Sequence, residues 1–188
     1  MKRLLILFIL TALLIGCSEK PTPREIVTEY YDAFNSSDFD RIAAVIADSI
    51  TIIDGEYVMP YSVESFHEQF KWDSIFQPTY DIVELEEQKS QIIATVASSS
   101  KRYRFLENDP LVCSFRISFD ANKITMIEAV EYTDADWNLW QANRDSLVNW
   151  TSRNHPELYG FIHDLTMNGA KNYLKAIELY EKRKEDSL

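Results

Sequence analysis

The sharpest chemical anomaly in this sequence is Glu128, an acidic residue inside an otherwise apolar segment with the pattern of a strand. On that pattern, Glu128 shares a face with Met126 and Val130. A carboxyl group among apolar neighbours has a raised pKa, so it can act as a general base near neutral pH. An ion pair across the sheet with Arg104 or Arg116 would explain the same residue structurally. The sequence leaves both interpretations open.

Two further side chains could act as a base, and each also has a structural explanation. Asp54 precedes Gly55 between two apolar runs, and Asp-Gly in that setting is typical of a hairpin turn. His67 is followed by Glu68 on an expected helix, where an exposed surface histidine is the simpler interpretation. The candidate catalytic residues are therefore Glu128, Asp54 and His67, without a coherent set of partners around them.

No motif in the sequence specifies a metal ion or a cofactor. The histidines are scattered and lack the close pairing of a helical zinc site: His67, His155 and His163. The glycines are isolated, so there is no phosphate-binding loop, and there is no Gly-x-Ser-x-Gly motif. We therefore expect neither a metal site nor a bound cofactor.

Aromatic residues make up 13% of the chain, enough to line an apolar cavity of the kind that binds small molecules. Packing of an ordinary hydrophobic core explains most of these side chains equally well. The candidate ligand-binding residues are Tyr31, Phe34, Tyr57, Trp72 and Glu128.

The N-terminal segment reads MKRLLILFILTALLIGC. Two basic residues precede an apolar run from Leu4 to Ile15, which is shorter than the ~20 residues that a membrane-spanning helix needs. This combination is typical of a secretory signal. Its ending, Leu-Ile-Gly-Cys, resembles a bacterial lipobox, which implies that residues 1–16 are removed and that Cys17 is lipidated. An ordinary signal peptide with a chance cysteine is the alternative.

The lipobox implies a lipoprotein of the cell envelope, attached to the membrane through Cys17. The outer membrane is favoured, because Ser18 and Glu19 lack the aspartate that marks inner-membrane retention in enteric bacteria. Residues 17–23 would form a short tether. The formal net charge is -11, with 19 basic and 30 acidic residues, and it becomes more negative without the signal. Such a surface repels nucleic acid and anionic lipid, so nucleic acid is not an expected partner.

A second cysteine, Cys113, has no partner once Cys17 is lipidated. It alternates with Phe115 and Ile117 along an expected strand, so we interpret it as a buried thiol that packs as a small apolar group. A reactive or metal-bound thiol is the alternative.

Hydrophobic periodicity predicts an α+β domain over residues 24–132 and a helical extension over residues 133–188. The expected helices of the domain are Arg24–Ser36, a second helix carrying Phe39 to Ile46, and Ser62–Phe76. The expected strands are Ser49–Ile53, Glu56–Met59, Tyr80–Glu87, Gln91–Ser98, Tyr103–Glu107, Leu111–Phe119 and Lys123–Tyr132. The extension should break at His155-Pro156 and then continue as a long helix containing Gly169, whose missing side chain allows another element to approach closely.

This order of elements resembles the nuclear transport factor 2-like, or polyketide-cyclase-like, superfamily. The residues that carry the resemblance are Arg24 to Asp40, an aromatic helix followed by a polar turn and a second helix, and the hairpin at Asp120 to Ile124. The resemblance implies a curved antiparallel sheet packed on the N-terminal helices around a cone-shaped cavity. Some members are dehydratases, isomerases or cyclases that use a carboxylate or histidine base inside this cavity, whereas others only bind or dimerise.

The function expected from the sequence is therefore that of a non-catalytic envelope module that binds a small apolar ligand or a protein partner. A small cavity enzyme of the dehydratase or isomerase type, with Glu128 or Asp54 as base, is the first alternative. A structural homodimer is the second.

Overall fold

The computed structural model describes residues 20–185. The expected signal segment 1–16 and the lipidation site Cys17 lie outside the described residues, so both stay predictions. Within residues 20–185, none of the helices combines the length and the continuous apolar character that a membrane crossing requires.

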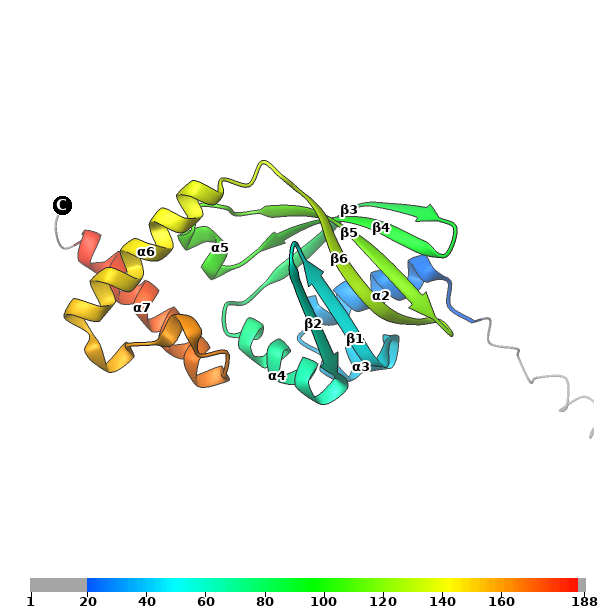
Figure 1. Cartoon of the computed structure of the whole chain (residues 1–188), viewed down its shortest axis with the longest axis horizontal. Coiled ribbons are helices and arrows are strands. Elements are labelled where there is room, and N and C mark those ends of the chain that lie inside the picture. The colour runs from blue at the N-terminus through cyan, green and yellow to red at the C-terminus, as the bar shows by residue number, and fades with distance from the viewer. Residues whose placement is uncertain (1–19, 186–188) are drawn as a thin grey trace, which may run out of the picture.

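Helices pack on a single sheet, and a helical extension follows it (Figure 1). The helices of the first part are α2 (Pro23–Asn35), α3 (Phe39–Val45), α4 (Val63–Ser74) and α5 (Lys101–Phe105). The strands are β1 (Ile46–Asp54), β2 (Tyr57–Ser62), β3 (Thr79–Gln88), β4 (Gln91–Ser99), β5 (Leu111–Asp120) and β6 (Lys123–Thr133). The extension contains α6 (Trp137–Asn154), the 3₁₀ helices η2 (Pro156–Leu158) and η3 (Phe161–His163), and α7 (Met167–Glu185).

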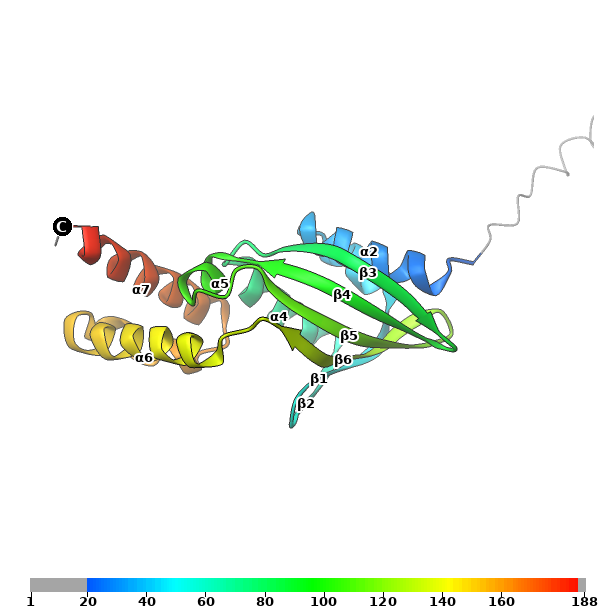
Figure 2. The same ribbon diagram turned by 90° about the horizontal axis from the view of Figure 1, so that it is seen from above.

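The six strands form one sheet in the order β2-β1-β6-β5-β4-β3 (Figure 2). Neighbouring strands are antiparallel except β1 and β6, which are parallel. Parallel strands cannot be joined by a tight turn, and the chain between β1 and β6 forms all the other strands before it returns. This places β6 inside the sheet and explains why apolar residues occupy both of its faces. The expected α+β fold class is confirmed.

The first hydrophobic cluster lies between the sheet and the helices α2 to α4. α2 buries one stripe of its surface, including Ile26, Tyr30 and Phe34. β4 buries alternate residues, among them Ile92 and Val96, because successive side chains of a strand point to opposite faces. Each fully buried side chain of this size contributes about 1.5–3 kcal/mol to folding.

A second hydrophobic cluster joins the extension to α4 and α5. Trp72 and Phe76 from the α4 region pack with Phe105 of α5 and with two tyrosines of α7. The ring centroids of Phe76 and Tyr173 are 5.4 Å apart, and those of Phe105 and Tyr180 are 5.7 Å apart. The extension is therefore docked on the same helix, α4, that covers the sheet.

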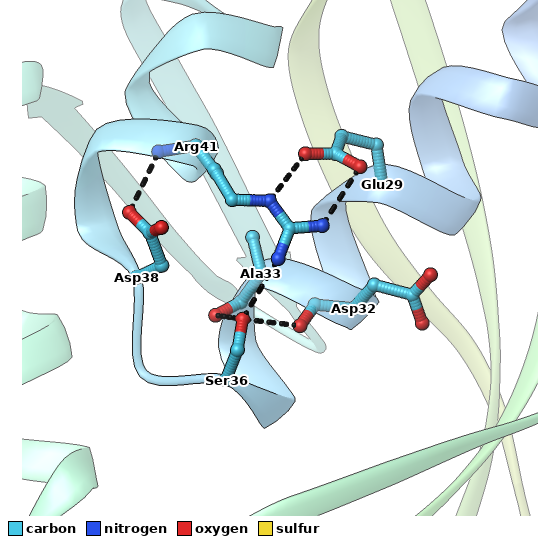
Figure 3. A network of polar contacts seen from close by, with 6 residues as sticks. All are labelled: Glu29, Asp32, Ala33, Ser36, Asp38 and Arg41. Atoms are coloured by element: carbon cyan, nitrogen blue, oxygen red, sulfur yellow. Dashed lines mark hydrogen bonds and ion pairs between the residues drawn. The ribbon is translucent and has the colours of Figure 1, made fainter.

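A bidentate ion pair holds α3 against α2 (Figure 3). Arg41 donates from Nε and Nη2 to the two carboxylate oxygens of Glu29, at 2.7 and 2.9 Å. Arg41 also donates from Nη1 to Ser36 Oγ at 2.9 Å, and its backbone N–H is capped by Asp38. Because both charged groups are partly exposed, the pair adds little to the free energy of folding. Its main effect is to fix the angle between two short helices.

Two features of the first part confirm or correct the sequence prediction. The first helix begins at Pro23, one residue before the expected Arg24, and Thr22 and Glu25 form a capping box ahead of it. The strand expected at Tyr103–Glu107 is wrong, because this segment belongs to the helix α5. Ser100 Oγ accepts the backbone N–H of Tyr103 at 3.0 Å and so caps this helix. A short aromatic run does not by itself distinguish a helix from a strand.

Two other element boundaries also differ from the prediction. Pro60 is expected to end the second strand of the hairpin, whereas β2 continues through it to Ser62. β2 is an edge strand, and proline is tolerated there because its missing N–H faces away from the ladder. The final helix begins at Met167, later than the expected restart at Pro156. Gly160, with a φ of 85°, separates two 3₁₀ turns that precede it.

Gly169, in the first turn of α7, lies so close to Asp164 that an added methyl group would overlap its backbone oxygen. A close approach is therefore present, although it comes from the loop directly before α7 and not from another element as expected. We predict that Gly169→Ala lowers the free energy of unfolding by about 1–3 kcal/mol, despite the better helix propensity of alanine. Urea denaturation measures this change, with Asn168→Ala, an exposed neighbour, as control. Equal stability of Gly169→Ala and the unmodified protein would contradict the overlap.

Candidate functional site

A cavity of about 440 Å³ lies between the sheet and the helices α2, α4 and α5. Its volume falls within the ~300–1,000 Å³ that is usual for small-molecule sites. The helices and the inward faces of β1, β5 and β6 supply its apolar wall. The apolar residues of this wall include Phe34, Ile52, Phe66, Phe115 and Ile127.

The polar side of the cavity is centred on Asp73 of α4. Gln69 Nε2 donates to Asp73 Oδ2 at 3.1 Å. Burial raises the pKa of Asp73 above its ordinary value of 3.8, although the charge of Arg102 and the hydrogen bond from Gln69 act in the opposite direction. Asp73 is thus a carboxyl group that keeps its proton to a higher pH than an exposed aspartate does.

Three tyrosines of the cavity wall are close enough to Asp73 for its charge to affect them: Tyr30 of α2, Tyr61 of β2 and Tyr80 of β3. Burial raises the pKa of each phenol, and nearby negative charge, including that of Asp73, raises it further. The phenols therefore stay neutral at physiological pH, and each offers one hydrogen-bond donor and one acceptor. They can orient a polar group of a bound molecule.

Arg102 of α5 lines the same cavity and is positioned by aromatic rings. Its guanidinium carbon lies 4.9 Å from the ring centroid of Trp72, 5.5 Å from that of Phe76 and 5.2 Å from that of Tyr103. These are cation–π distances. Within the described part of the chain, no carboxylate oxygen forms an ion pair with Arg102 at 4.0 Å or less.

The extension also contributes to the cavity wall. Leu165, from the loop before α7, lines it, although the side chain is 63% exposed. The loop is held in place because Trp72 Nε1 donates to the backbone oxygen of Asp164 at 3.2 Å. The Trp72 ring system therefore lines the cavity, and its indole N–H forms a hydrogen bond with the extension.

Four of the residues singled out from the sequence line this cavity: Tyr31, Phe34, Trp72 and Asp54. Asp54 lies at the end of β1, before the hairpin turn at Gly55, so it is both a turn residue and part of the cavity rim. Its charge, together with burial as the larger cause, raises the pKa of the Tyr132 phenol.

Glu128 lies outside the cavity. Its neighbour Ile127 lines the cavity, so Glu128 points to the opposite face of β6. Arg116 is its partner in the register between β5 and β6, and Arg116 Nη1 donates to Glu128 Oε2 at 2.6 Å. The ion pair across the sheet that the sequence left open is therefore present.

His67 and Tyr57 also lie away from the cavity lining. The His67 ring stacks on Phe39, with centroids 4.0 Å apart and planes inclined by 10°. Tyr57 sits at the tip of the β1-β2 hairpin and is 75% exposed. Three of the predicted site residues are thus absent from the cavity lining: Glu128, His67 and Tyr57.

The polar residues of the cavity that sequence reasoning missed are Gln69, Asp73 and Arg102. A signal for Asp73 exists, because it follows Phe66 and Phe70 at helical spacing and so lies close to their apolar stripe. Arg102 had no comparable signal, because its helix was expected to be a strand.

The thiol of Cys113 is buried in β5, and burial raises its pKa to about 12. It packs as an apolar group, as expected. Among residues 20–185, no group of three or more histidine, cysteine, aspartate or glutamate side chains could hold a metal ion.

Solved structures with a similar fold place this arrangement in context. A nuclear transport factor 2-like protein of unknown function from Cytophaga hutchinsonii superposes with a TM-score of 0.50 and 12% identity, covering 62% of this chain and 94% of that chain. A candidate ketosteroid isomerase from Kribbella flavida superposes with a TM-score of 0.51 and 10% identity, covering 61% and 79%. The chain has the nuclear transport factor 2-like fold. The fold that the sequence predicted is confirmed.

A third structure with a similar fold is that of IdmH, a candidate polyketide cyclase from Streptomyces antibioticus. It superposes with a TM-score of 0.51 and 15% identity, covering 66% of this chain and 99% of that chain. No protein-family model and no curated protein sequence matches this chain. At such low identities, the likeness establishes the fold and leaves the activity open.

The raised pKa of Asp73 should make the free energy of unfolding depend on pH. As the pH rises above 3.8, the unfolded chain releases the Asp73 proton before the folded chain does, so the folded state loses stability. We therefore expect the free energy of unfolding of the unmodified protein, minus that of Asp73→Asn, to fall as the pH rises from 3.8 through the raised pKa. Urea denaturation across this pH range measures the difference.

Glu29→Gln is the matched control for this experiment, with the opposite sign. The hydrogen bond from Arg41 lowers the pKa of Glu29, so its contribution to stability is lost as the pH falls. A difference for Asp73→Asn that is independent of pH would show that its carboxyl group titrates as an exposed one.

Proposed function

We propose that this chain is a binding module whose cavity takes a small, largely apolar ligand with one polar end. The observation that carries the proposal is the division of the cavity into an aromatic wall and a polar side around Asp73 and Arg102. Apolar surface provides affinity for such a ligand, and a few fixed polar groups orient it. The volume of about 440 Å³ suits a molecule of roughly two or three rings.

A cavity enzyme is the second candidate, and Asp73 is the observation that favours it. In its ionised form, a carboxyl group with a raised pKa, close to neutral phenols, is a stronger base than an exposed aspartate and can accept a proton from a weakly acidic ligand. Native mass spectrometry distinguishes the two candidates. For an enzyme, Asp73→Asn protein should retain a substrate that differs from the molecule bound to unmodified protein in mass, or, for an isomerase, in chromatographic retention at the same mass. The same molecule in both, by mass and by retention, would favour a module that only binds.

The site of action is a proposal of its own. The lipobox ending at Cys17 supports lipid attachment to the cell envelope, with the outer membrane favoured, and α2 begins only a few residues later at Pro23. A cavity on so short a tether would act close to the membrane surface. The intact mass of the protein from its native envelope tests this proposal, since a mass without added acyl chains would contradict it.

The binding proposal predicts that filling the cavity abolishes the binding of an apolar probe. The neutral dye N-phenyl-1-naphthylamine fluoresces strongly in apolar sites. We expect the unmodified protein to bind it, and Ile52→Trp or Met59→Trp, both on the cavity wall, to weaken binding by about tenfold or more, which is ~1.4 kcal/mol. Fluorescence titration measures the affinity.

Val83→Trp is the control, because it adds the same side chain at a position that is 63% exposed and outside the cavity lining. Its affinity for the dye should match that of the unmodified protein. Equal binding by Ile52→Trp, Met59→Trp and Val83→Trp would place the dye on the surface and contradict the proposal.

A further inference from the structure

Arg102 differs from the other arginines of the domain. Within residues 24–132, the other four arginines each form an ion pair with a carboxylate: Arg24, Arg41, Arg104 and Arg116. Arg102 is surrounded by aromatic rings and has no carboxylate within 4.0 Å among residues 20–185, yet it lines the cavity. In a chain with 30 acidic residues, a cation in a cavity without an ion-pair partner is unusual.

The rings around Arg102 position its side chain without supplying an opposite charge. Trp72 and Phe76 come from the α4 region, and Tyr103 from α5 itself. A guanidinium group that packs against rings can still donate through the N–H groups in its own plane, and their fork matches the two oxygens of a carboxylate. The rings hold the side chain in place before a ligand arrives, which reduces the entropy lost on binding.

The nearest acidic group of the cavity, Asp73, interacts with Arg102 through its charge but forms no direct ion pair with it. Its Oδ2 accepts a hydrogen bond from Gln69, and burial favours its protonated form. The other groups whose pKa is raised by the charge of Asp73 are neutral phenols: Tyr30, Tyr61 and Tyr80. When Asp73 holds its proton, Arg102 is the charged group that remains on this side of the cavity.

We propose that Arg102 binds a carboxylate, or a similar oxyanion, carried by an aromatic or polycyclic ligand whose rings occupy the apolar part of the cavity. This inference rests on the proposed binding function and names the chemical class of its ligand. The ligand is thus an organic acid with an apolar body.

Two dyes with the same ring system and different charge test the inference. N-phenyl-1-naphthylamine is neutral, and 1-anilinonaphthalene-8-sulfonate adds an oxyanion to the same rings. In the purified full chain, we expect Arg102→Gln to weaken the binding of the anionic dye by about tenfold or more, and that of the neutral dye by less than about twofold. Arg102→Lys should retain part of the preference, because it keeps the charge and loses the fork.

Arg104→Gln is the matched control on the same helix. Arg104 pairs with Asp109 at 3.5 Å and lies outside the cavity lining, so its loss should change neither affinity. The pH provides a second measurement. The anionic dye should bind more tightly as the pH falls and Asp73 takes up its proton, and this dependence should flatten in Asp73→Asn.

The outcomes separate this inference from the proposed function. If Arg102→Gln weakens the binding of both dyes equally, Arg102 only maintains the structure of the cavity and the inference fails. If it weakens neither, while Ile52→Trp still excludes the neutral dye, the cavity binds ligands without recognising an anion. If the unmodified protein binds neither dye, the proposed function and the inference fail together.

Discussion

Helix α4 packs into two hydrophobic clusters at once, and the rest of the structure depends on this double packing. Phe66 and Phe70 pack towards the sheet, whereas Trp72 packs with the C-terminal extension. Residues of α4 between and around these contacts, Gln69 and Asp73, line the cavity. A helix fixed on two sides cannot shift to fill an adjacent space, which explains how an aromatic-rich domain keeps a cavity that close packing would otherwise remove.

The same constraint places opposite charges on one side of an apolar cavity. Asp73 comes from α4 and Arg102 from α5, and the aromatic rings that carry α4 into the second cluster also surround Arg102. The two groups interact through their charges, although they do not form a direct ion pair. The protonation of Asp73 therefore changes the net charge on this side of the cavity.

Much of the fold is predictable from the sequence, because its long elements carry strong periodic signals. The aromatic stripe of α2 and the alternation in β4 and β5 specify which faces are buried, and Asp54-Gly55 marks the first hairpin. The site is predictable only in part. Glu128 is anomalous along the chain, but its explanation lies in Arg116 on a neighbouring strand, and pairing between strands cannot be read from one segment. Arg102 lies on a five-residue helix whose periodicity is too short to measure.

The Trp72–Asp164 hydrogen bond couples the cavity to the C-terminal extension. Trp72 lines the cavity, Leu165 completes its wall, and the bond to Asp164 ties the loop before α7 to both. A ligand that packs against these side chains also holds the loop in its docked position. By linkage, any local opening that lifts this loop from α4 must release part of the ligand's contact surface. The affinity of the cavity for the proposed ligand and the exchange of the backbone amides around Asp164 with solvent would thus both report on this opening equilibrium.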